Sequence, residues 1–131
     1  LTDRDEFVMV RQYRHGEREV TLEIPGGIVD PGESAAGAAA RELLEETGYR
    51  AEAVTRLGVV NPNPALFGNR TETYLARGVK QVAEIRNGAT EETVVELVPL
   101  AELRRHAREG RISSALVIAA LYWFELETRG E

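Results

Sequence analysis

The chain has 131 residues, of which 43% are hydrophobic and 29% charged, a composition that suits one globular domain with a substantial core. It contains no cysteine, which excludes disulfides and thiolate metal sites, and its two histidines are too few for a typical histidine-based zinc site. The formal net charge of −6 disfavours a nucleic-acid-binding protein, because such proteins usually carry a basic stripe.

No segment of the sequence predicts contact with a membrane. The longest unbroken apolar run, residues 115–124, is too short to span a bilayer, and no basic-then-apolar signal segment opens the chain. We therefore expect one cytoplasmic domain over residues 1–131. The chain begins with Leu1 rather than Met, which is compatible with a missing N-terminal segment.

The first part of the chain reads as two strands followed by a helix. Phe7–Arg14 reads as a strand, and in Glu19–Ile24 the apolar residues Val20, Leu22 and Ile24 alternate with polar ones, which is typical of a second strand. Three glycines and two prolines in residues 25–33 then interrupt regular structure. A helix is expected over Ser34–Thr47, with Ser34 as its N-cap and Gly48 as the residue that ends it.

The second part reads as three strands followed by two helices. The strands are expected at Val54–Val60, Thr71–Ala76 and Thr93–Val98. Pro99 is expected to open a helix that ends near Gly110, because proline suits the first helical position, and the last helix is expected at about residues 113–127. Since strands and helices mix without a regular βαβ alternation, we expect an α+β fold, a sandwich with a mixed sheet between helices.

Three carboxylates crowd the C-terminal part of the first predicted helix. Residues three and four apart share a helix face, so Glu42, Glu45 and Glu46 repel one another by roughly 0.2–0.5 kcal/mol per pair. The helix dipole also disfavours anions at this end. A hard divalent cation such as Mg²⁺ would relieve both effects, because it prefers carboxylate oxygens. The alternative is a solvated face on which Arg41 pairs with Glu45.

The spacing around these carboxylates resembles the Nudix box. Gly27 is followed after five residues by Glu33, and after seven more by the segment RELLEETG at 41–48. Tyr49 stands at the next position, where an aliphatic residue is usual. The resemblance implies an α/β/α sandwich around a mixed sheet. It also implies a hydrolase that uses Mg²⁺ or Mn²⁺ to cleave a diphosphate linked to another moiety.

The same resemblance implies roles for the residues of the box. Glu42 and Glu46 are expected to bind the metal, and the carbonyl of Gly26 is expected to join them. Glu45 is expected to be a further ligand or the general base, since one carboxylate must remain free of metal to accept a proton. Arg41 is expected to orient one of the box carboxylates.

Beyond the box, nearly the whole chain resembles the ADP-ribose pyrophosphatase branch of this family. The segments VRQYRHG and LEIPGG precede the box, Pro64 lies fifteen residues after Tyr49, and TEETVVELVPLAEL resembles the C-terminal third of that branch. The branch implies a loop glutamate that acts as base or extra ligand. Glu91 is the best match, with Glu92 beside it. Arg14 matches a phosphate-contacting arginine, the alternative being a surface charge at a strand end.

The remaining candidates concern substrate contact. Tyr13, at a strand end, and Phe67, in a loop, are candidates for contact with a substrate ring. Pro64 either forms part of the substrate wall or only stiffens its loop, while His15 and His106 are expected at the surface. The leading reaction is hydrolysis of ADP-ribose to AMP and ribose 5-phosphate by a homodimer. Other nucleoside diphosphate sugars are the close alternative, and a non-catalytic nucleotide sensor is the alternative of another class.

Overall fold

The structure, a computed structural model, describes residues 1–86 and 92–131. Every strand predicted from the sequence is present: β1 (Glu6–Arg14), β2 (Glu19–Glu23), β4 (Val54–Val60), β5 (Thr71–Ala76) and β7 (Thr93–Pro99). Two further strands, β3 (Tyr49–Arg50) and β6 (Lys80–Gln81), have only two residues each, too few to show a periodicity in the sequence. The helices are α1 (Ala35–Thr47), α2 (Leu103–Arg108), α3 (Ala115–Arg129) and the 3-10 turn η1 (Leu100–Glu102).

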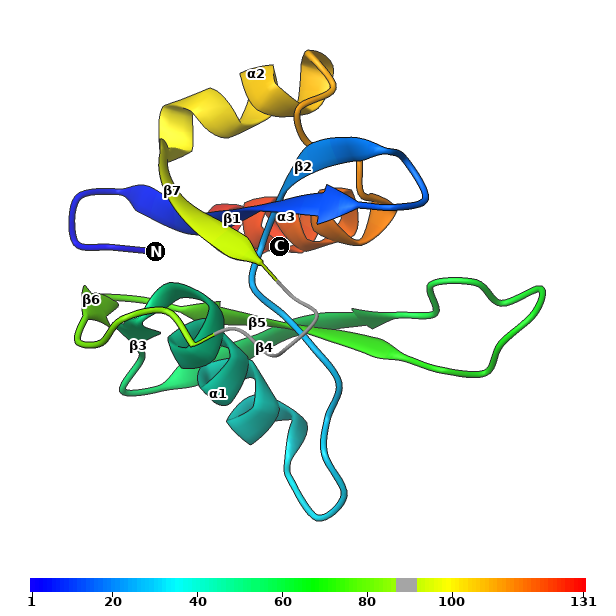
Figure 1. The fold of residues 1–131 in the computed structure, drawn as a ribbon, viewed down its shortest axis with the longest axis horizontal. Coiled ribbons are helices and arrows are strands. Elements are labelled where there is room, and N and C mark those ends of the chain that lie inside the picture. Colours follow the sequence, from blue (N-terminus) through cyan, green and yellow to red (C-terminus); the bar gives the residue numbers. More distant parts are fainter. Residues whose placement is uncertain (87–91) are drawn as a thin grey trace.

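The described strands form three hydrogen-bonded groups, β2–β1–β7, β3–β6 and β4–β5. The sequence predicts a mixed sheet, and the strand pairs in the described residues are antiparallel. Figure 1 shows the β2–β1–β7 sheet in one half of the molecule and the β4–β5 hairpin in the other, with α1 beside the hairpin. Among the described helices, none is long and apolar enough to cross a bilayer.

The β2–β1–β7 sheet is covered on both of its faces. Val8 of β1 belongs to an apolar cluster with Leu43 of α1. Its neighbour Met9 belongs to a second cluster, with Leu103 of α2 and Val117 of α3. Because successive side chains of a strand point to opposite faces, α1 lies against one face of the sheet and α2 and α3 lie against the other (Figure 1). This arrangement confirms the predicted α/β/α sandwich.

Helix α1 has both of the end signals predicted for it. The Ser34 hydroxyl accepts a hydrogen bond from the N–H of Gly37 at 3.0 Å, which caps the first turn. Gly48 ends the helix in the left-handed conformation with φ 74°, and its N–H donates to the carbonyl of Leu44. A Cβ at this position would lie 2.0 Å from the carbonyl oxygen of Ala83. The position therefore requires glycine for its conformation and for close packing of the chain.

The predicted helix starting at Pro99 is wrong at its N-terminal end. Pro99 is the last residue of β7 and pairs with Glu6 of β1, and the turn η1 separates it from α2. Proline suits the end of a strand as well as the first position of a helix, and here the pairing with β1 decides between them. The last helix, expected from about residue 113, begins at Ala115, with Ser114 at the N-cap position.

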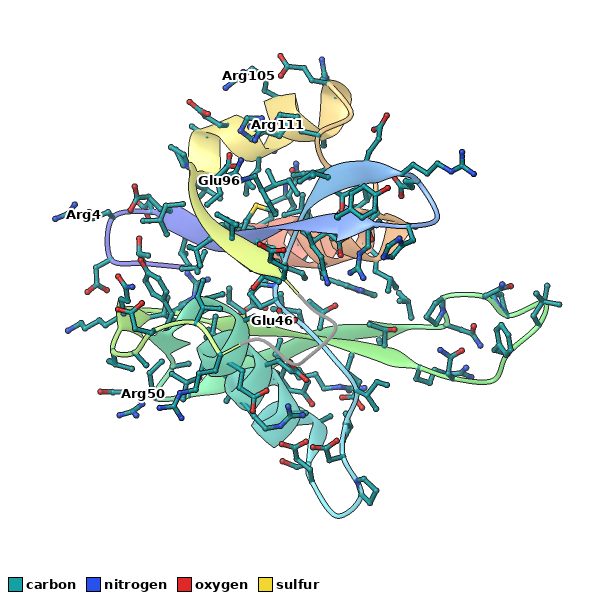
Figure 2. The ribbon with its side chains drawn as sticks, viewed as in Figure 1. Arg4, Glu46, Arg50, Glu96, Arg105 and Arg111 are labelled. Atoms are coloured by element: carbon teal, nitrogen blue, oxygen red, sulfur yellow. The ribbon has the colours of Figure 1, made fainter. Side chains whose placement is uncertain are left out.

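His106 was expected at the surface, and it is buried with 4% of its area exposed. Both of its ring nitrogens lie within 3.3 Å of the Arg111 guanidinium, which also donates two hydrogen bonds to Glu96 of β7. Figure 2 shows Arg111 and Glu96 together on the side of the sheet that faces α2. The imidazole therefore joins α2 to the sheet on the face away from α1, outside the region that holds the box glutamates.

Candidate functional site

Arg41 is the centre of a cluster of box carboxylates. Its guanidinium binds Glu33 with two parallel hydrogen bonds of 2.8 and 3.0 Å. Its Nη1 also donates to Glu42 Oε1 at 2.9 Å and to Glu45 Oε2 at 3.1 Å. Its Nη2 donates to the carbonyl of Ile28 at 3.1 Å. Arg41 thus ties the loop of residues 25–34 to α1 and orients two of the crowded carboxylates.

The charges of this cluster shift the titration of its members. Hydrogen bonds from the Arg41 guanidinium, and then from the main-chain N–H of Asp30, hold the pKa of Glu33 below its usual range. In return, the carboxylates of Glu33 and then Glu42 raise the pKa of Arg41. The guanidinium therefore stays charged, and Glu33 remains an ionised carboxylate that connects the loop to the helix.

Glu46 is the most deeply buried carboxylate of the box, with 4% of its area exposed. The N–H of Gly26 donates to its Oε2 at 3.1 Å, and the Thr93 hydroxyl donates to its main-chain carbonyl at 3.0 Å. Figure 2 shows Glu46 of α1 in the middle of the molecule, near the β1–β7 strands. From the sequence, the carbonyl of Gly26 and the carboxylate of Glu46 are expected to bind the same metal ion. In the structure the two residues are joined by a hydrogen bond from the Gly26 N–H to that carboxylate.

Gly27 allows the main chain to approach the second predicted metal ligand. A Cβ on this residue would lie 2.1 Å from Oε1 and 2.4 Å from Cδ of Glu42. Real Cβ atoms do not approach other atoms so closely, so any larger residue here would displace the carboxylate. Glu42 is therefore held between Gly27 on one side and Arg41 on the other.

The donor set suits a hard divalent cation. Within residues 1–86 and 92–131, no three acidic or histidine side chains form a closed cluster ready to hold a metal ion. The main chain of residues 26–27 nevertheless contacts both Glu42 and Glu46, which lie four residues apart on α1. Two carboxylates beside exposed main-chain groups are oxygen donors of the kind that Mg²⁺ and Mn²⁺ take.

A mostly apolar cavity of about 480 Å³ adjoins this region. Gly26, Gly27 and Glu42 line one part of it, and Leu121 and Phe124 of α3 line another. Asn69, Arg70, Glu72 and Tyr74 add polar groups from the β4–β5 hairpin. Its volume lies within the range of small-molecule sites, and it borders one of the predicted metal ligands.

Arg14 lies in a fixed ion pair at the end of β1. Its Nε and Nη2 donate to the two carboxylate oxygens of Glu23 at 2.7 and 2.6 Å, and the Thr21 hydroxyl donates to the same carboxylate at 2.6 Å. The Arg14 hydrogen bonds hold the pKa of Glu23 below its usual value despite the opposing effect of burial. Glu23 lies two residues before the loop of residues 25–34, here called the box loop, so the ion pair with Glu23 orients Arg14 beside this loop.

The other predicted substrate residues are spread over the surface. Tyr13 is half exposed at the end of β1, where its ring packs edge-on against His15. Phe67 has 62% of its area exposed in the loop between β4 and β5, and Pro64 is exposed in the same loop. Figure 1 shows this loop at the far tip of the hairpin, away from α1. The structure therefore does not bring Pro64 and Phe67 together with the box glutamates.

Of the two predicted loop glutamates, Glu91 lies outside the described residues, and Glu92 is exposed directly before β7. Sequence reasoning missed Thr93, the next residue, which is 4% exposed and hydrogen-bonded to Glu46. It also missed the carboxylate partner of Arg14. A polar residue within an apolar strand pattern was the available signal for Thr93, but it does not identify the partner.

Comparison with known proteins agrees with this geometry. The family model of the NUDIX domain matches residues 1–121. The chain belongs to the Nudix family. The acidic cluster around Arg41 is therefore the Nudix box of a pyrophosphatase-type hydrolase, as the spacing of the box predicts.

Relatives of this Nudix chain match it along nearly its whole length. The methanol dehydrogenase activator of Bacillus methanolicus is 31% identical over 129 residues, and the ADP-ribose pyrophosphatase of Bacillus subtilis is 28% identical over 128 residues. Each match covers 97% of this chain and 69% of the relative. The crystal structure of an ADP compounds hydrolase superposes with a TM-score of 0.87 at 26% identity, covering 99% of this chain and 70% of that one.

Proposed function

We propose that this Nudix hydrolase cleaves ADP-ribose, or a closely similar nucleoside diphosphate sugar, to a nucleoside monophosphate and a sugar phosphate in the presence of Mg²⁺ or Mn²⁺. The observation that carries the proposal is the pairing of Glu42 and Glu46 against the main chain of Gly26 and Gly27, beside a cavity of about 480 Å³. The similarity to the Bacillus subtilis ADP-ribose pyrophosphatase supports the choice of substrate class.

In this proposal Glu42 and Glu46 would hold the divalent metal together with the carbonyl of Gly26, and Glu45 would be either a further donor or the proton acceptor. When bound, the metal would neutralise phosphate oxygens and lower the pKa of the attacking water. Arg41 keeps the carboxylates oriented through its contacts with Glu33, Glu42 and Glu45. Its fixed position limits the reorganisation needed when the substrate binds.

Other residues orient the substrate and accept a proton. Arg14 contacts the diphosphate, since its guanidinium is partly exposed while Glu23 fixes its position. One of Glu45, Glu91 and Glu92 takes the proton from the attacking water. Among the box glutamates bound by Arg41, Glu45 has the most exposed side chain, at 44%, which suits exchange of a proton with solvent.

Substrate contact and assembly complete the proposal. Tyr13 and Phe67 offer exposed rings for contact with a base, and Pro64 shapes the same loop as Phe67. In this proposal the protein is a homodimer. Leu116 and Ile118, exposed on α3, support a contact between subunits. Analytical ultracentrifugation tests the assembly, and a monomer at micromolar concentration contradicts it.

A substrate panel tests the reaction. The purified protein is incubated with Mg²⁺ and ADP-ribose, other nucleoside diphosphate sugars or 8-oxo-dGTP, and products are separated by ion-exchange chromatography. We expect AMP and ribose 5-phosphate from ADP-ribose at the highest kcat/KM of the panel. Preferential cleavage of 8-oxo-dGTP would overturn the substrate assignment, and tight binding without turnover of any compound would indicate a nucleotide sensor.

A variant pair tests the metal assignment. Glu46→Gln removes the charge of the buried carboxylate with little change in volume, and we expect it to lower kcat by about 10²–10⁴-fold. Glu127→Gln, an exposed change on α3, is the matched control and keeps full activity. Circular dichroism melting should show both variants folded. Activity of Glu46→Gln within a few-fold of the control would show that Glu46 is not a metal ligand.

A further inference from the structure

The last turn of α1 has its carbonyl groups paired by the surrounding chain. A helix leaves its final carbonyls without partners of its own, and they must be satisfied from outside. Here the N–H of Gly48 binds the carbonyl of Leu44 at 2.8 Å, and the N–H of Arg86 binds that of Glu45 at 2.7 Å. The next carbonyl, that of Glu46, receives a side-chain hydroxyl, Thr93 Oγ1, at 3.0 Å.

The Thr93 hydroxyl connects two layers of the sandwich. Thr93 is the first residue of β7 and pairs with Gln12 of β1, so its main chain is fixed in the sheet. Thr93 and Glu46 are each only 4% exposed, and their hydrogen bond joins residues 47 positions apart. A buried hydrogen bond of this kind fixes the relative position of helix and sheet at one residue, and that residue is Glu46.

Glu46 is consequently held at two points. Its main chain is tied to the sheet by Thr93, and its carboxylate is tied to the box loop by the N–H of Gly26 at 3.1 Å. A shift of the main chain would move the carboxylate relative to Gly26 and to Glu42, its partner on α1. The Thr93 hydroxyl thus acts on the position of the carboxylate through the main-chain carbonyl of the same residue.

We infer that Thr93 is a positioning residue for the metal site: its hydroxyl fixes the main chain of Glu46 and thereby the carboxylate that binds the divalent cation. The inference rests on the proposed role of Glu46 as a metal ligand. Groups that orient a metal ligand from behind commonly change metal affinity or activity by about 10–100-fold when they are removed. The residue lies outside the Nudix box, at the start of β7 and directly after Glu91 and Glu92 in the sequence.

Three variants of Thr93 separate positioning from packing. Thr93→Val keeps the size and branching of the side chain and removes the hydroxyl, Thr93→Ser keeps the hydroxyl, and Thr93→Cys offers a weaker donor. Mn²⁺ binding is measured by the loss of the free-ion electron paramagnetic resonance signal. We expect Thr93→Val to weaken binding by about 10–100-fold, Thr93→Ser to restore most of it, and Thr93→Cys to fall between them. Should the valine variant not fold, the order of the serine and cysteine variants still decides.

A double-variant cycle shows whether the effect passes through Glu46. In the Glu46→Gln background, Thr93→Val should cause no further loss of Mn²⁺ affinity, because the ligand that it positions is gone. In the otherwise unchanged chain, kcat with ADP-ribose should fall while KM for the substrate changes little. A purely structural role predicts a lower melting temperature with unchanged Mn²⁺ affinity, and that result overturns the inference. Failure of the unchanged protein to bind Mn²⁺ at all would instead overturn the proposed metal site.

Discussion

Replacement of Gly27 by alanine should damage the site without damaging the fold. The added Cβ would lie 2.1 Å from Glu42 Oε1, whereas ordinary contact begins at 3.4 Å, so the carboxylate must retreat by about 1.3 Å, the difference between the two. The colliding atoms are the far end of a flexible side chain, so the main chain has no need to move. A misplacement of about 1 Å in a catalytic site can cost about 10²-fold in rate, which corresponds to about 2.7 kcal/mol.

The matched variant is Gly26→Ala, because a Cβ on the adjacent glycine meets no atom within 4 Å. Steady-state kinetics with ADP-ribose and saturating Mg²⁺ should show kcat lowered about 100-fold for Gly27→Ala and far less for Gly26→Ala. Urea unfolding should give both variants free energies of unfolding within about 1 kcal/mol of the unchanged protein. Equal activity of the two variants would refute the reasoning, since it would mean that the position of Glu42 does not matter.

Two further predictions concern stability. Gly48→Ala should lower the free energy of unfolding by about 2–3 kcal/mol in urea titrations, because its Cβ would meet the Ala83 carbonyl oxygen at 2.0 Å in a left-handed conformation. The control is Gly110→Ala, with φ 79° and no neighbour within 4 Å, which should lower it by only about 1 kcal/mol. Equal losses for the two variants would contradict the clash. The hydrogen bonds from Arg14 hold the folded-state pKa of Glu23 below its usual value of about 4.5, so the ion pair stabilises the protein above that pH and the contribution is lost as pH falls through the folded pKa. Glu23→Gln should therefore lower stability at neutral pH and flatten the loss of stability below pH 4.5, and an unchanged slope would argue against the pair.

The parts of the fold that depend on local signals could be predicted from the sequence. Ser34 and Gly48 mark the ends of α1 because capping and left-handed termination depend on neighbouring residues alone. The resemblance to the Nudix box implied that Arg41 orients a carboxylate, and in the structure Arg41 is hydrogen-bonded to Glu33, Glu42 and Glu45. Local patterns of this kind need no knowledge of which strands become neighbours.

The parts that depend on distant pairing could not be predicted. Pro99 carries the signal of a helix start, and only its partner Glu6 on β1, far away in the chain, makes it the end of a strand. The burial of His106 depends in the same way on the approach of Arg111 and Glu96. Sequence periodicity reports which face of an element is apolar, not which distant residue it meets.

Tyr49, the one departure from the box pattern, has a simple explanation in the fold. It packs against the buried cluster of Val8, Leu43 and Val79, where an aliphatic residue would serve the same purpose. The position needs apolar area rather than a particular chemistry, so an aromatic ring is acceptable. The departure therefore concerns the packing of β3 against the sandwich and leaves the acidic face of α1 unchanged.

The contacts of Arg41 also bear on how the proposed metal site would form. In many small metalloproteins the ligand charges can be brought together only when the ion is present, so metal binding and folding are one event. Here a guanidinium supplied by the same helix already offsets the repulsion among Glu33, Glu42 and Glu45. The chain can therefore fold without the ion, and the proposed site can take up Mg²⁺ or Mn²⁺ afterwards. Under the proposed metal dependence, the activity would follow the supply of metal while folding would not.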